Sequence, residues 1–550
     1  MTFFKAVAVD FDGTLTSTGG LAPHALKAIE EARRNGLAVV LVSGRIGAEL
    51  LAEYPQIVDY VDAMILENGA VSVIDGQAHA LAPPVDGGLD QALAKRGVPY
   101  RRGEVIMAID GKYATTVVEV IGELGLDYQI ARNRSALMVL PAGVTKGTGL
   151  AAVLAKMNLS AHNTVAVGDA ENDLSVFGIA EIGAAVADAV PSVQRYADIV
   201  LDKPNGAGVA ELLTGPYLNG AQRWCPPRRW VDIGTFDDAS PTRIPGSQGR
   251  ILVTGPAASG KSYLVGLMAE RWILANYCVL LLDPEGDHVQ LQELDQVRVF
   301  DGGDRLPEPA ELVDALHPQS SAVVDMSGLA EAHKVDYLQR LRSTAEAHRE
   351  RYGFPHWVIY DEAHLLGTDE QAHWARRGGY VLSSFAAASL PAKEVDNSDI
   401  VLTLSDPDTA ADMASGRRAT IRFGAGPIRP FIIADRLTAH VRHCHKYADI
   451  RLPQERRFYF HTTDGIAPAA TMHEFSASVK HLDERSLEYH LERGDFSRWL
   501  DGTIADQELA TRVAAWEDEL EARRAADVER IRQKLIQAVE ERYSPAQEHH

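Results

Sequence analysis

Cysteine is scarce in this sequence, and its scarcity excludes two common kinds of site. The 550 residues contain only Cys225, Cys278 and Cys444, which are far apart and form no C-x-x-C pair. Neither a disulfide framework nor a cysteine-based zinc site is therefore supported. Long apolar runs are also missing, because no stretch reaches the ~20 residues of a membrane-spanning helix or has the pattern of a signal peptide. We expect a cytoplasmic protein without membrane contact.

Positive charge is in deficit as well. The net charge is −22 at pH 7, and acidic residues outnumber basic ones in each of the segments 1–220, 221–450 and 451–550. No segment has the basic surface that is typical of nucleic-acid binding, although a few basic side chains lining a ring pore would escape this count. DNA is therefore a weakly supported partner. The length exceeds what a single core supports and predicts about three domains.

The clearest motif is ILVTGPAASGKSYL, residues 251–264. An apolar strand precedes a glycine-rich turn and a helical pattern follows it, with Gly255, Gly260, Lys261 and Ser262 at the positions of G-x-x-x-x-G-K-[ST]. In such a loop, backbone N–H groups and the lysine contact phosphate oxygens, and the hydroxyl binds Mg²⁺. The context predicts an ATP site rather than a chance glycine-rich turn.

A second motif, HWVIYDEAHLL, places Asp361 and Glu362 at the end of an apolar strand. An aspartate at such a position holds Mg²⁺, and the adjacent glutamate polarises the attacking water. Between the two motifs, CVLLLDPEGDH (278–288) predicts another buried strand that ends in acidic residues. The sequence therefore favours ATP hydrolysis over mere nucleotide binding.

These three motifs, in this order, resemble the HerA/FtsK-type ATPases over about residues 250–435. The resemblance implies a P-loop NTPase α/β domain and a ring-shaped homo-oligomer, most simply a hexamer, in which Arg417 or Arg418 contacts the neighbour's nucleotide. Exposed surface arginines are an equal alternative, and Arg422 competes for the role. Where the family usually has a Gln sensor, Ser389 is the only nearby candidate, which weakens the case for a translocated polymer.

The chain begins with FFKAVAVDFDGTLT, an apolar strand followed by Asp10 and Asp12. Carboxylates two residues apart leave a strand on the same side. Asp10 is suited to attack phosphorus, and Asp12 to protonate the leaving oxygen and then activate water. Both are also candidate Mg²⁺ ligands. The alternative is an ordinary acidic turn after a strand.

Three later motifs favour the chemical interpretation. LAVVLVSGR ends a strand at Ser43, whose hydroxyl suits phosphoryl oxygens, and Lys146 at a helix start supplies a cation. TVAVGDAENDLSVF ends a strand at Asp169, with Asn172 and Asp173 one turn later to complete a magnesium site. Each motif alone is weak, but the four in order predict hydrolysis of a phosphate ester.

This set resembles the haloacid dehalogenase (HAD) superfamily of phosphatases over about residues 1–215. ILENGA (65–70) and the stretch 190–213 resemble its Cof-like, sucrose-phosphatase-like branch. The resemblance implies a Rossmann-like core with a small α/β cap inserted at about 79–140. A small cap suits a compact phosphorylated metabolite, such as a sugar phosphate or phosphoglycolate.

Two segments have less specific patterns. Residues 216–248 predict a linker and a short β segment, in which Trp224 and Trp230 are better suited to dock two domains than to stack on a base. A cluster within residues 249–450 has helical spacing that suits zinc, although an exposed helix is the commoner outcome: His440, His443, Cys444 and His445.

Residues 451–550 read first as a strand and then as helices with apolar residues three or four apart. Those apolar faces either pack onto the ATPase domain or form an oligomerisation surface. The sequence as a whole predicts a multidomain α/β bifunctional enzyme, with a magnesium-dependent phosphatase domain, an ATPase domain and a helical C-terminal domain. The alternative is a ring-shaped DNA motor or nucleotide-gated scaffold in which the first domain is regulatory.

Overall fold

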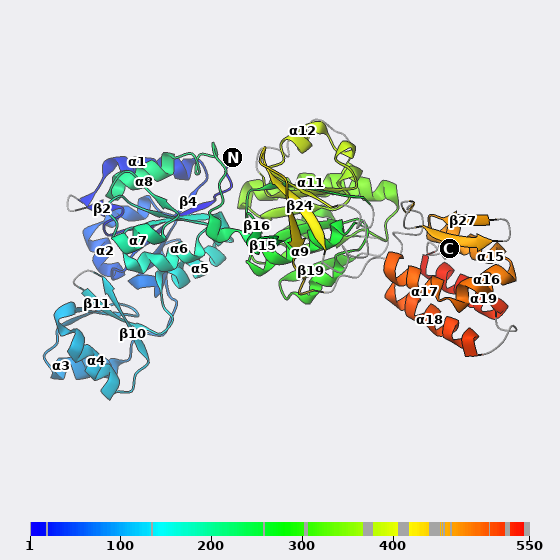
Figure 1. Cartoon of the computed structure of the whole chain (residues 1–550). Coiled ribbons are helices and arrows are strands. Elements are labelled where there is room, and N and C mark those ends of the chain that lie inside the picture. The colour runs from blue at the N-terminus through cyan, green and yellow to red at the C-terminus, as the bar shows by residue number, and fades with distance from the viewer. Residues whose placement is uncertain are drawn as a thin grey trace.

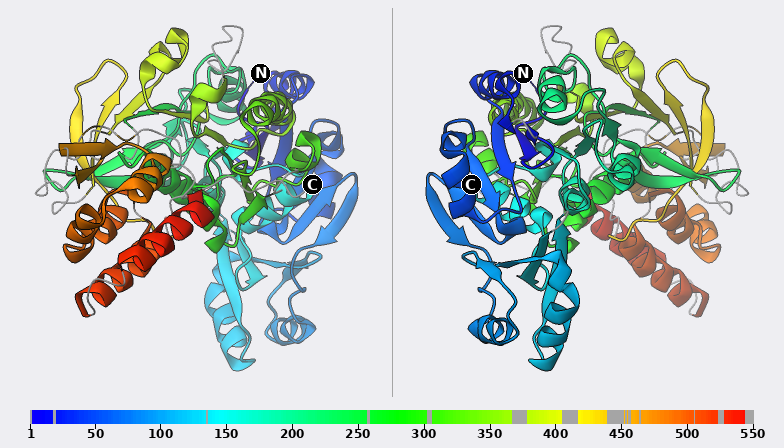
Figure 2. Two further views of the ribbon diagram at one scale, coloured as in Figure 1. Left: turned by 90° about the vertical axis from the view of Figure 1, so that its right-hand side faces the viewer. Right: turned by 90° about the vertical axis from the view of Figure 1, so that its left-hand side faces the viewer.

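A computed structural model describes residues 2–17, 20–133, 136–256, 259–301, 306–366, 378–404, 417–438, 452, 454, 457–462, 465–504, 506–522 and 528–543. The chain forms an N-terminal domain with a cap, a central domain and a C-terminal domain, which follow one another in a row (Figure 1). In both views of Figure 2 the cap and the C-terminal helices extend in different directions. The predicted fold class is confirmed.

The N-terminal domain is a sheet covered by helices on both faces. Its strand order is β14-β13-β12-β1-β4-β5-β6-β7, and β14 to β5 are parallel whereas β6 and β7 are antiparallel. Buried strands such as AVAVD and AVVLV are almost wholly apolar because both faces are covered. The elements are β1 (Ala6–Asp10), β2 (Thr16–Ser17), β3 (Gly20–Leu21), α1 (Pro23–Arg34), β4 (Ala38–Val42), α2 (Gly47–Glu53), β5 (Ala63–Leu66), β6 (Val71–Ile74), β7 (Gln77–Ala80), α5 (Lys146–Lys156), β12 (Thr164–Gly168), α6 (Leu174–Ile179), β13 (Ile182–Ala185), α7 (Pro191–Tyr196), β14 (Ile199–Val200) and α8 (Asn205–Thr214).

The cap is a four-stranded antiparallel sheet with two helices on one face. Its strand order is β10-β11-β9-β8. This mixture of helices and strands agrees with the predicted small α/β cap. The elements are α3 (Gly87–Lys95), β8 (Tyr100–Arg102), β9 (Met107–Asp110), α4 (Ala114–Glu123), β10 (Tyr128–Asn133) and β11 (Ala136–Pro141).

The central domain is an eleven-stranded sheet with the order β16-β15-β25-β24-β23-β17-β22-β21-β18-β20-β19. Seven strands from β23 to β19 are parallel, and the four at the other edge are antiparallel. The elements are β15 (Val231–Phe236), β16 (Pro241–Ile244), β17 (Arg250–Thr254), α9 (Lys261–Leu274), β18 (Val279–Asp283), β19 (Val297–Asp301), α10 (Pro309–Asp314), β20 (Ser321–Asp325), α11 (Glu331–Tyr352), β21 (Trp357–Tyr360), β22 (Tyr380–Ser384), α12 (Ala392–Asp396), β23 (Ile400–Thr403), β24 (Arg418–Phe423) and β25 (Arg429–Ile433).

The segment between these domains connects them through its aromatic side chains. Trp224 packs against the core of the N-terminal domain and contacts the ring of Tyr217. Trp230 stacks on Phe423 of the central domain. These contacts agree with the interpretation that the two tryptophans dock the domains.

The C-terminal domain has its own apolar core, in which Phe458, Phe475 and Trp499 are in mutual contact. The apolar faces of its last helices are part of that core, so they are used within the domain rather than against the ATPase domain or a partner. No helix among the described residues is long and apolar enough to span a membrane. The elements are β26 (Phe458–Thr462), β27 (Gly465–Ala469), α15 (Met472–His481), α16 (Glu484–Glu492), α17 (Asp495–Trp499), α18 (Gln507–Ala522) and α19 (Val528–Tyr543).

Candidate active sites

The first site lies where three neighbouring parallel strands of the N-terminal domain end. Strand β1 lies between β12 and β4, and the three strands point the same way. Asp10, Ser43 and Asp169 stand at or directly after their carboxyl ends. The topology therefore gathers side chains that are far apart in the sequence at one edge of the sheet, as the motifs predicted.

Lys146 lies at the centre of this site. It is the first residue of α5, whose start is fixed by a capping box between Thr145 and Thr148. Its ammonium donates hydrogen bonds to Asp10 Oδ1 and Asp173 Oδ1, each at 2.6 Å. All three side chains are buried. The predicted cation therefore bridges the predicted nucleophile and a predicted metal ligand.

Asp10, Asp169 and Asp173 form a compact carboxylate cluster, with ligand atoms within 4.8 Å of one another. The second oxygen of Asp173 accepts the backbone N–H groups of Asp169 and Ala170, both at 3.0 Å, which fixes its orientation. A buried all-oxygen set of this kind fits a hard divalent cation such as Mg²⁺.

The electrostatics of the cluster support the same assignment. Burial and the charges of Asp173 and Asp169 raise the pKa of Asp10 well above its usual value, and Lys146 opposes them only in part. For Lys146, burial lowers the pKa, but the carboxylates of Asp10 and Asp173 outweigh it and the net shift is upward. The cluster therefore has three carboxyl groups and only one buried lysine to balance them. A bound divalent cation would supply the missing positive charge.

Asp12 is held by an ion pair with an arginine. Its carboxylate binds the guanidinium of Arg45, with Nη2 to Oδ1 at 2.7 Å and Nε to Oδ2 at 2.9 Å. Arg45 also pairs with Glu53 and lies over the rings of Phe11 and Tyr54. The orientation of Asp12 is thus fixed by Arg45, and its roles as an acid–base group and as a metal ligand both stay predictions. The sequence analysis missed Arg45, although it follows Ser43 by two residues at the same strand end.

The two remaining predicted polar residues lie beside the cluster. Ser43 is buried, and its hydroxyl oxygen accepts the backbone N–H of Arg45 at 3.1 Å. Asn172 donates its side-chain N–H to Asn68 Oδ1 at 3.3 Å, and its part in the magnesium site stays a prediction. Asn172 therefore connects the loop of Asp173 to the turn that follows β5.

That turn, Glu67–Gly69, connects the cap to the catalytic core. The buried carboxylate of Glu67 accepts three backbone N–H groups from the cap segment 104–106, at 2.8 to 3.0 Å. Glu67, Asn68 and Gly69 all have positive φ angles. A Cβ on Gly69 would lie 1.9 Å from the carbonyl oxygen of Thr145, directly before Lys146. The turn therefore fixes the cap and the catalytic lysine together.

We expect Gly69→Ala to destabilise the protein and to reduce phosphatase turnover. The left-handed backbone costs about 1 to 3 kcal/mol for a non-glycine residue, and the overlap with a backbone atom adds about 1 to 3 kcal/mol. Denaturant unfolding and phosphate release measure both effects. Gly36→Ala is the matched control, since Gly36 has a φ of +83° but open space around its Cβ position. Equal losses in the two variants would contradict the close approach at Gly69.

The second site lies at the carboxyl end of β17 in the central domain. Gly255 follows the strand, and Gly260 has a φ of +98° at the start of α9. A Cβ on Gly255 would lie 2.7 Å from the carbonyl oxygen of Leu404, so this position requires glycine. Lys261 and Ser262 are the first residues of α9 and are buried. On either side of residues 257 and 258, the described strand end and helix start are thus placed as the P-loop motif requires.

Asp361 and Glu362 follow β21, two strands away from β17 in the sheet. Asp361 Oδ2 binds His288 Nε2 at 2.8 Å, and Asp361 Oδ1 accepts the N–H of Glu362 at 3.1 Å. Glu362 has a φ of +49°, and such strained backbone is concentrated at functional positions.

The DPEGDH segment is folded around Asp283, which ends β18. Its carboxylate accepts the backbone N–H groups of Glu285, Asp287 and His288, at 2.8 to 3.3 Å. Burial raises the pKa of Asp283 to about 7, against the effect of His288. The segment therefore delivers the fully buried His288 to Asp361, a contact that the sequence analysis did not predict.

The predicted arginines all make contacts within their own chain. Arg417 lies over the ring of Tyr263, 3.8 Å from its centroid, and Arg418 pairs with Asp237 at 3.2 Å. Arg422 donates to the carbonyl oxygen of Gly424 at 2.6 Å. Ser389 shares a hydrogen bond with the hydroxyl of Ser384 at 2.6 Å. A role of these arginines at a neighbour's nucleotide stays a prediction. The candidate zinc cluster of His440, His443, Cys444 and His445 lies outside the described residues.

Two family models match this chain. Residues 7–80 and 115–213 match the haloacid dehalogenase-like hydrolase model, and residues 249–350 match the central domain of helicase HerA. The first match covers the site around Lys146, and the second covers the P-loop and the DPEGDH segment.

Curated relatives cover the N-terminal part. A phosphoglycolate phosphatase from Archaeoglobus fulgidus is 30% identical over 227 residues, which are 38% of this chain and 95% of that protein. One from Pyrobaculum islandicum is 31% identical over 38% of this chain and 94% of its own length. One from Sulfurisphaera tokodaii is 34% identical over 28% of this chain and 70% of its own length. A solved structure from Thermoplasma acidophilum is 19% identical over 39% of this chain and 99% of its own chain, with a TM-score of 0.35.

Proposed function

Because the chain belongs to the haloacid dehalogenase-like hydrolases through its N-terminal domain and has a HerA central domain behind it, we propose that it is a bifunctional enzyme. The N-terminal site hydrolyses a phosphomonoester with Mg²⁺, and the central site hydrolyses ATP. The observation that supports the first activity is the buried group of Lys146 with Asp10, Asp169 and Asp173.

The roles at the first site follow from these contacts. Lys146 holds Oδ1 of Asp10, so we assign the attack on phosphorus to Oδ2, which forms an aspartyl-phosphate as the ester P–O bond breaks. Asp12, oriented by Arg45, protonates the leaving oxygen and then takes a proton from the water that hydrolyses the aspartyl-phosphate. Ser43 hydrogen-bonds a phosphoryl oxygen. Asp10, Asp169 and Asp173 would hold Mg²⁺, which when bound neutralises phosphoryl charge.

The substrate we propose is a compact phosphorylated metabolite of the phosphoglycolate kind. Two observations support this choice: the small cap held to the core by Glu67, and the activity named for the relatives. Comparison of kcat/KM for 2-phosphoglycolate with that for glucose 6-phosphate tests it. A clear preference for the larger sugar phosphate would overturn this substrate class.

At the second site Lys261 contacts the β- and γ-phosphates of ATP, and Ser262 with Asp361 would hold its Mg²⁺. Glu362 directs water at the γ-phosphate. His288 positions Asp361 through the 2.8 Å hydrogen bond, and the carboxylate of Asp283 fixes the backbone of His288. The arrangement is built for hydrolysis rather than for storage of a structural nucleotide.

A second candidate function rests on the HerA match. In it the ATPase is the working part, as a ring motor on DNA or as a nucleotide-gated scaffold, and the phosphatase domain is regulatory. The acidic composition, with a net charge of −22, counts against DNA as a partner. Stimulation of ATP turnover by double-stranded DNA would favour this candidate.

Assembly into a ring, most simply a hexamer, completes the proposal. An arginine from a neighbouring subunit would stabilise transition-state charge that the P-loop alone does not neutralise. We expect light scattering with ATP and Mg²⁺ to give a multiple of the monomer mass, and the Arg417→Ala/Arg418→Ala double variant to lose at least about 10³-fold in ATP turnover. Arg422→Ala is the control, with nearly normal turnover. A monomer with unaffected turnover in the double variant would exclude the ring.

A further inference from the structure

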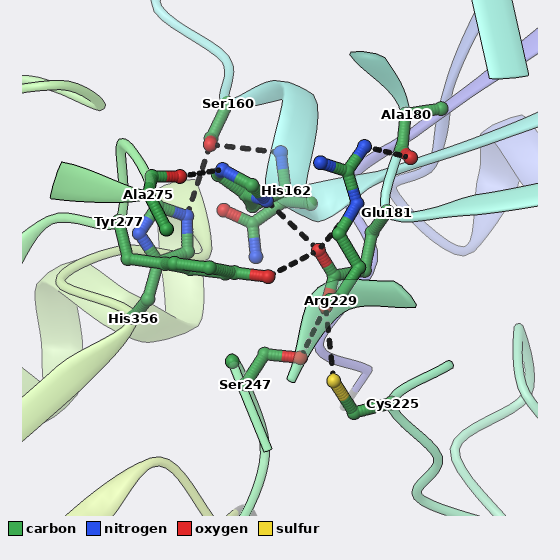
Figure 3. A network of polar contacts seen from close by, with 12 residues as sticks. Ser160, His162, Ala180, Glu181, Cys225, Arg229, Ser247, Ala275, Tyr277 and His356 are labelled. Carbon is green, nitrogen blue, oxygen red and sulfur yellow. Dashed lines mark hydrogen bonds and ion pairs between the residues drawn. The ribbon is translucent and has the colours of Figure 1, made fainter. Parts of the chain in front are cut away.

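The N-terminal and central domains meet in a buried polar network, which we call the joint (Figure 3). It consists of Ser160, His162 and Glu181 from the N-terminal domain, and of Ser247, Tyr277 and His356 from the central domain. All six are buried. The phosphatases from Archaeoglobus fulgidus and Pyrobaculum islandicum are covered over 95% and 94% of their length by 38% of this chain, so the central-domain side of the joint has no counterpart in those two matches.

Glu181 is the centre of the joint. Its carboxylate accepts hydrogen bonds from Tyr277 at 2.9 Å and from the hydroxyl of Ser247, and it binds His162 Nδ1 at 2.8 Å. Burial would raise the pKa of Glu181, but the hydrogen bond and charge of His162 and the charge of Arg229 hold it below its usual value. Glu181 is therefore a buried carboxylate whose partners come from three separate parts of the chain.

Each histidine of the joint contacts the other domain. His162 has an acceptor at each ring nitrogen, since Nδ1 faces Glu181 and Nε2 lies 3.1 Å from the carbonyl oxygen of Ala275. His162 therefore connects Glu181 to the backbone directly after α9. His356 accepts the N–H of Cys278 at Nδ1 and donates from Nε2 to Ser160, and burial lowers its pKa well below the usual value, so it is neutral. A buried polar group that loses its partner is costly, so the joint depends on both domains being in place.

Backbone contacts beside the joint leave little room for movement. Asn163 donates to the carbonyl oxygen of Gly353 at 3.1 Å, and a Cβ on Gly353 would lie 2.6 Å from the Asn163 side chain. Lys5 donates to the carbonyl oxygen of Glu350 at 2.6 Å. Both partners lie at the end of α11. The two domains therefore pack closely at this interface and are not joined by the linker alone.

The joint lies at the amino ends of the strands that carry the catalytic carboxylates. His162 stands two residues before β12, which leads to Asp169. His356 stands directly before β21, which leads to Asp361, and Tyr277 stands two residues before β18. Each catalytic edge therefore lies at the opposite end of these strands from the joint, and single strands connect the joint to both sites.

We propose that this edge of the N-terminal domain is a dedicated docking surface for the central domain, and that the two domains unfold and respond to ligands as one cooperative unit. A ligand that binds only the folded unit then stabilises both domains, although it contacts one. In this proposal each phosphatase domain is fixed to its own ATPase domain.

Hydrogen exchange on the full-length protein tests the proposal. The test rests on the proposed function only for the choice of the two ligands. Mg²⁺ with beryllium fluoride, a phosphoryl analogue, addresses the first site, and Mg²⁺·ADP addresses the second. At a ligand concentration about tenfold above Kd, exchange of the most protected amides in a cooperative unit slows about tenfold. We expect that slowing in β18 and β21 with beryllium fluoride, and in β1 and β12 with ADP.

The outcomes separate the two proposals. Protection of β1 and β12 by beryllium fluoride without any in β18 and β21 overturns the cooperative unit. If beryllium fluoride protects neither set, the phosphatase assignment fails, and the ADP arm alone decides the joint by the response of β1 and β12. Glu181→Gln should abolish the cross-domain protection in both arms. Glu270→Gln, which alters another fully buried carboxylate outside the joint, should retain it. Loss of the cross-domain response in both variants would contradict a role specific to Glu181.

Discussion

Replacement of Asp10 with asparagine is expected to abolish phosphatase turnover while ATP hydrolysis stays close to the wild-type rate. An amide does not attack phosphorus, and removal of a nucleophile reduces kcat by about 10⁴-fold or more. The hydrogen bond from Lys146 to Oδ1 can persist with the amide oxygen, so the fold should be retained. Phosphate release from a metabolite phosphate and from ATP, measured on one preparation, gives both rates.

The matched control is Asp75→Asn, in the exposed turn after β6. Asp75 has a φ of +51°, a conformation that asparagine also tolerates. This variant should keep both activities. An Asp10→Asn protein with normal phosphatase turnover would contradict the assignment of the nucleophile, and equal loss of both activities would mean that the two sites are one catalytic machine.

The second large effect is expected at the central site, where two substitutions should fail in different ways. Lys261→Ala should remove nucleotide binding, because the lysine supplies the charge that holds the phosphates. Glu362→Gln should keep ATP bound but reduce its hydrolysis by about 10²- to 10⁴-fold, because only the orientation of water is lost. Equilibrium binding of a fluorescent ATP analogue and single-turnover hydrolysis distinguish the two defects.

Glu308→Gln serves as the control, since Glu308 is exposed and pairs with Arg340 at the surface. It should bind and hydrolyse ATP normally. A Glu362→Gln protein that hydrolyses ATP at the wild-type rate would exclude the glutamate from catalysis. A Lys261→Ala protein that still binds ATP tightly would exclude the P-loop as the nucleotide site.

The sequence allowed prediction of those site residues that stand at strand ends. Asp10, Ser43, Asp169 and Asp361 each follow a short apolar run, and parallel strands bring such positions to one edge of a sheet. Lys261 is fixed by the local spacing of the P-loop. In these cases the chemistry and the local structure lie within the same ten or so residues.

Contacts between distant residues were not predictable in this way. His288 and Asp361 are 73 positions apart, and Glu181 and Tyr277 are 96 apart. Glu67 binds backbone N–H groups of the cap, which have no side-chain signature at all. Such pairs arise from how the sheets are assembled, and a single sequence has no periodic pattern that reports them.

The central claim is that one chain has two separate active sites, and parallel rate measurements on a small set of variants test it most directly. Phosphate release from 2-phosphoglycolate and a panel of sugar phosphates would be measured with Mg²⁺ and without ATP, beside ATP turnover with and without DNA. We predict that at least one metabolite is hydrolysed, that Asp10→Asn removes only this activity, and that Lys261→Ala removes only ATP turnover. Two results together would contradict the account. The wild-type protein would release phosphate from no metabolite faster than Asp10→Asn does, and its ATP turnover would depend on DNA.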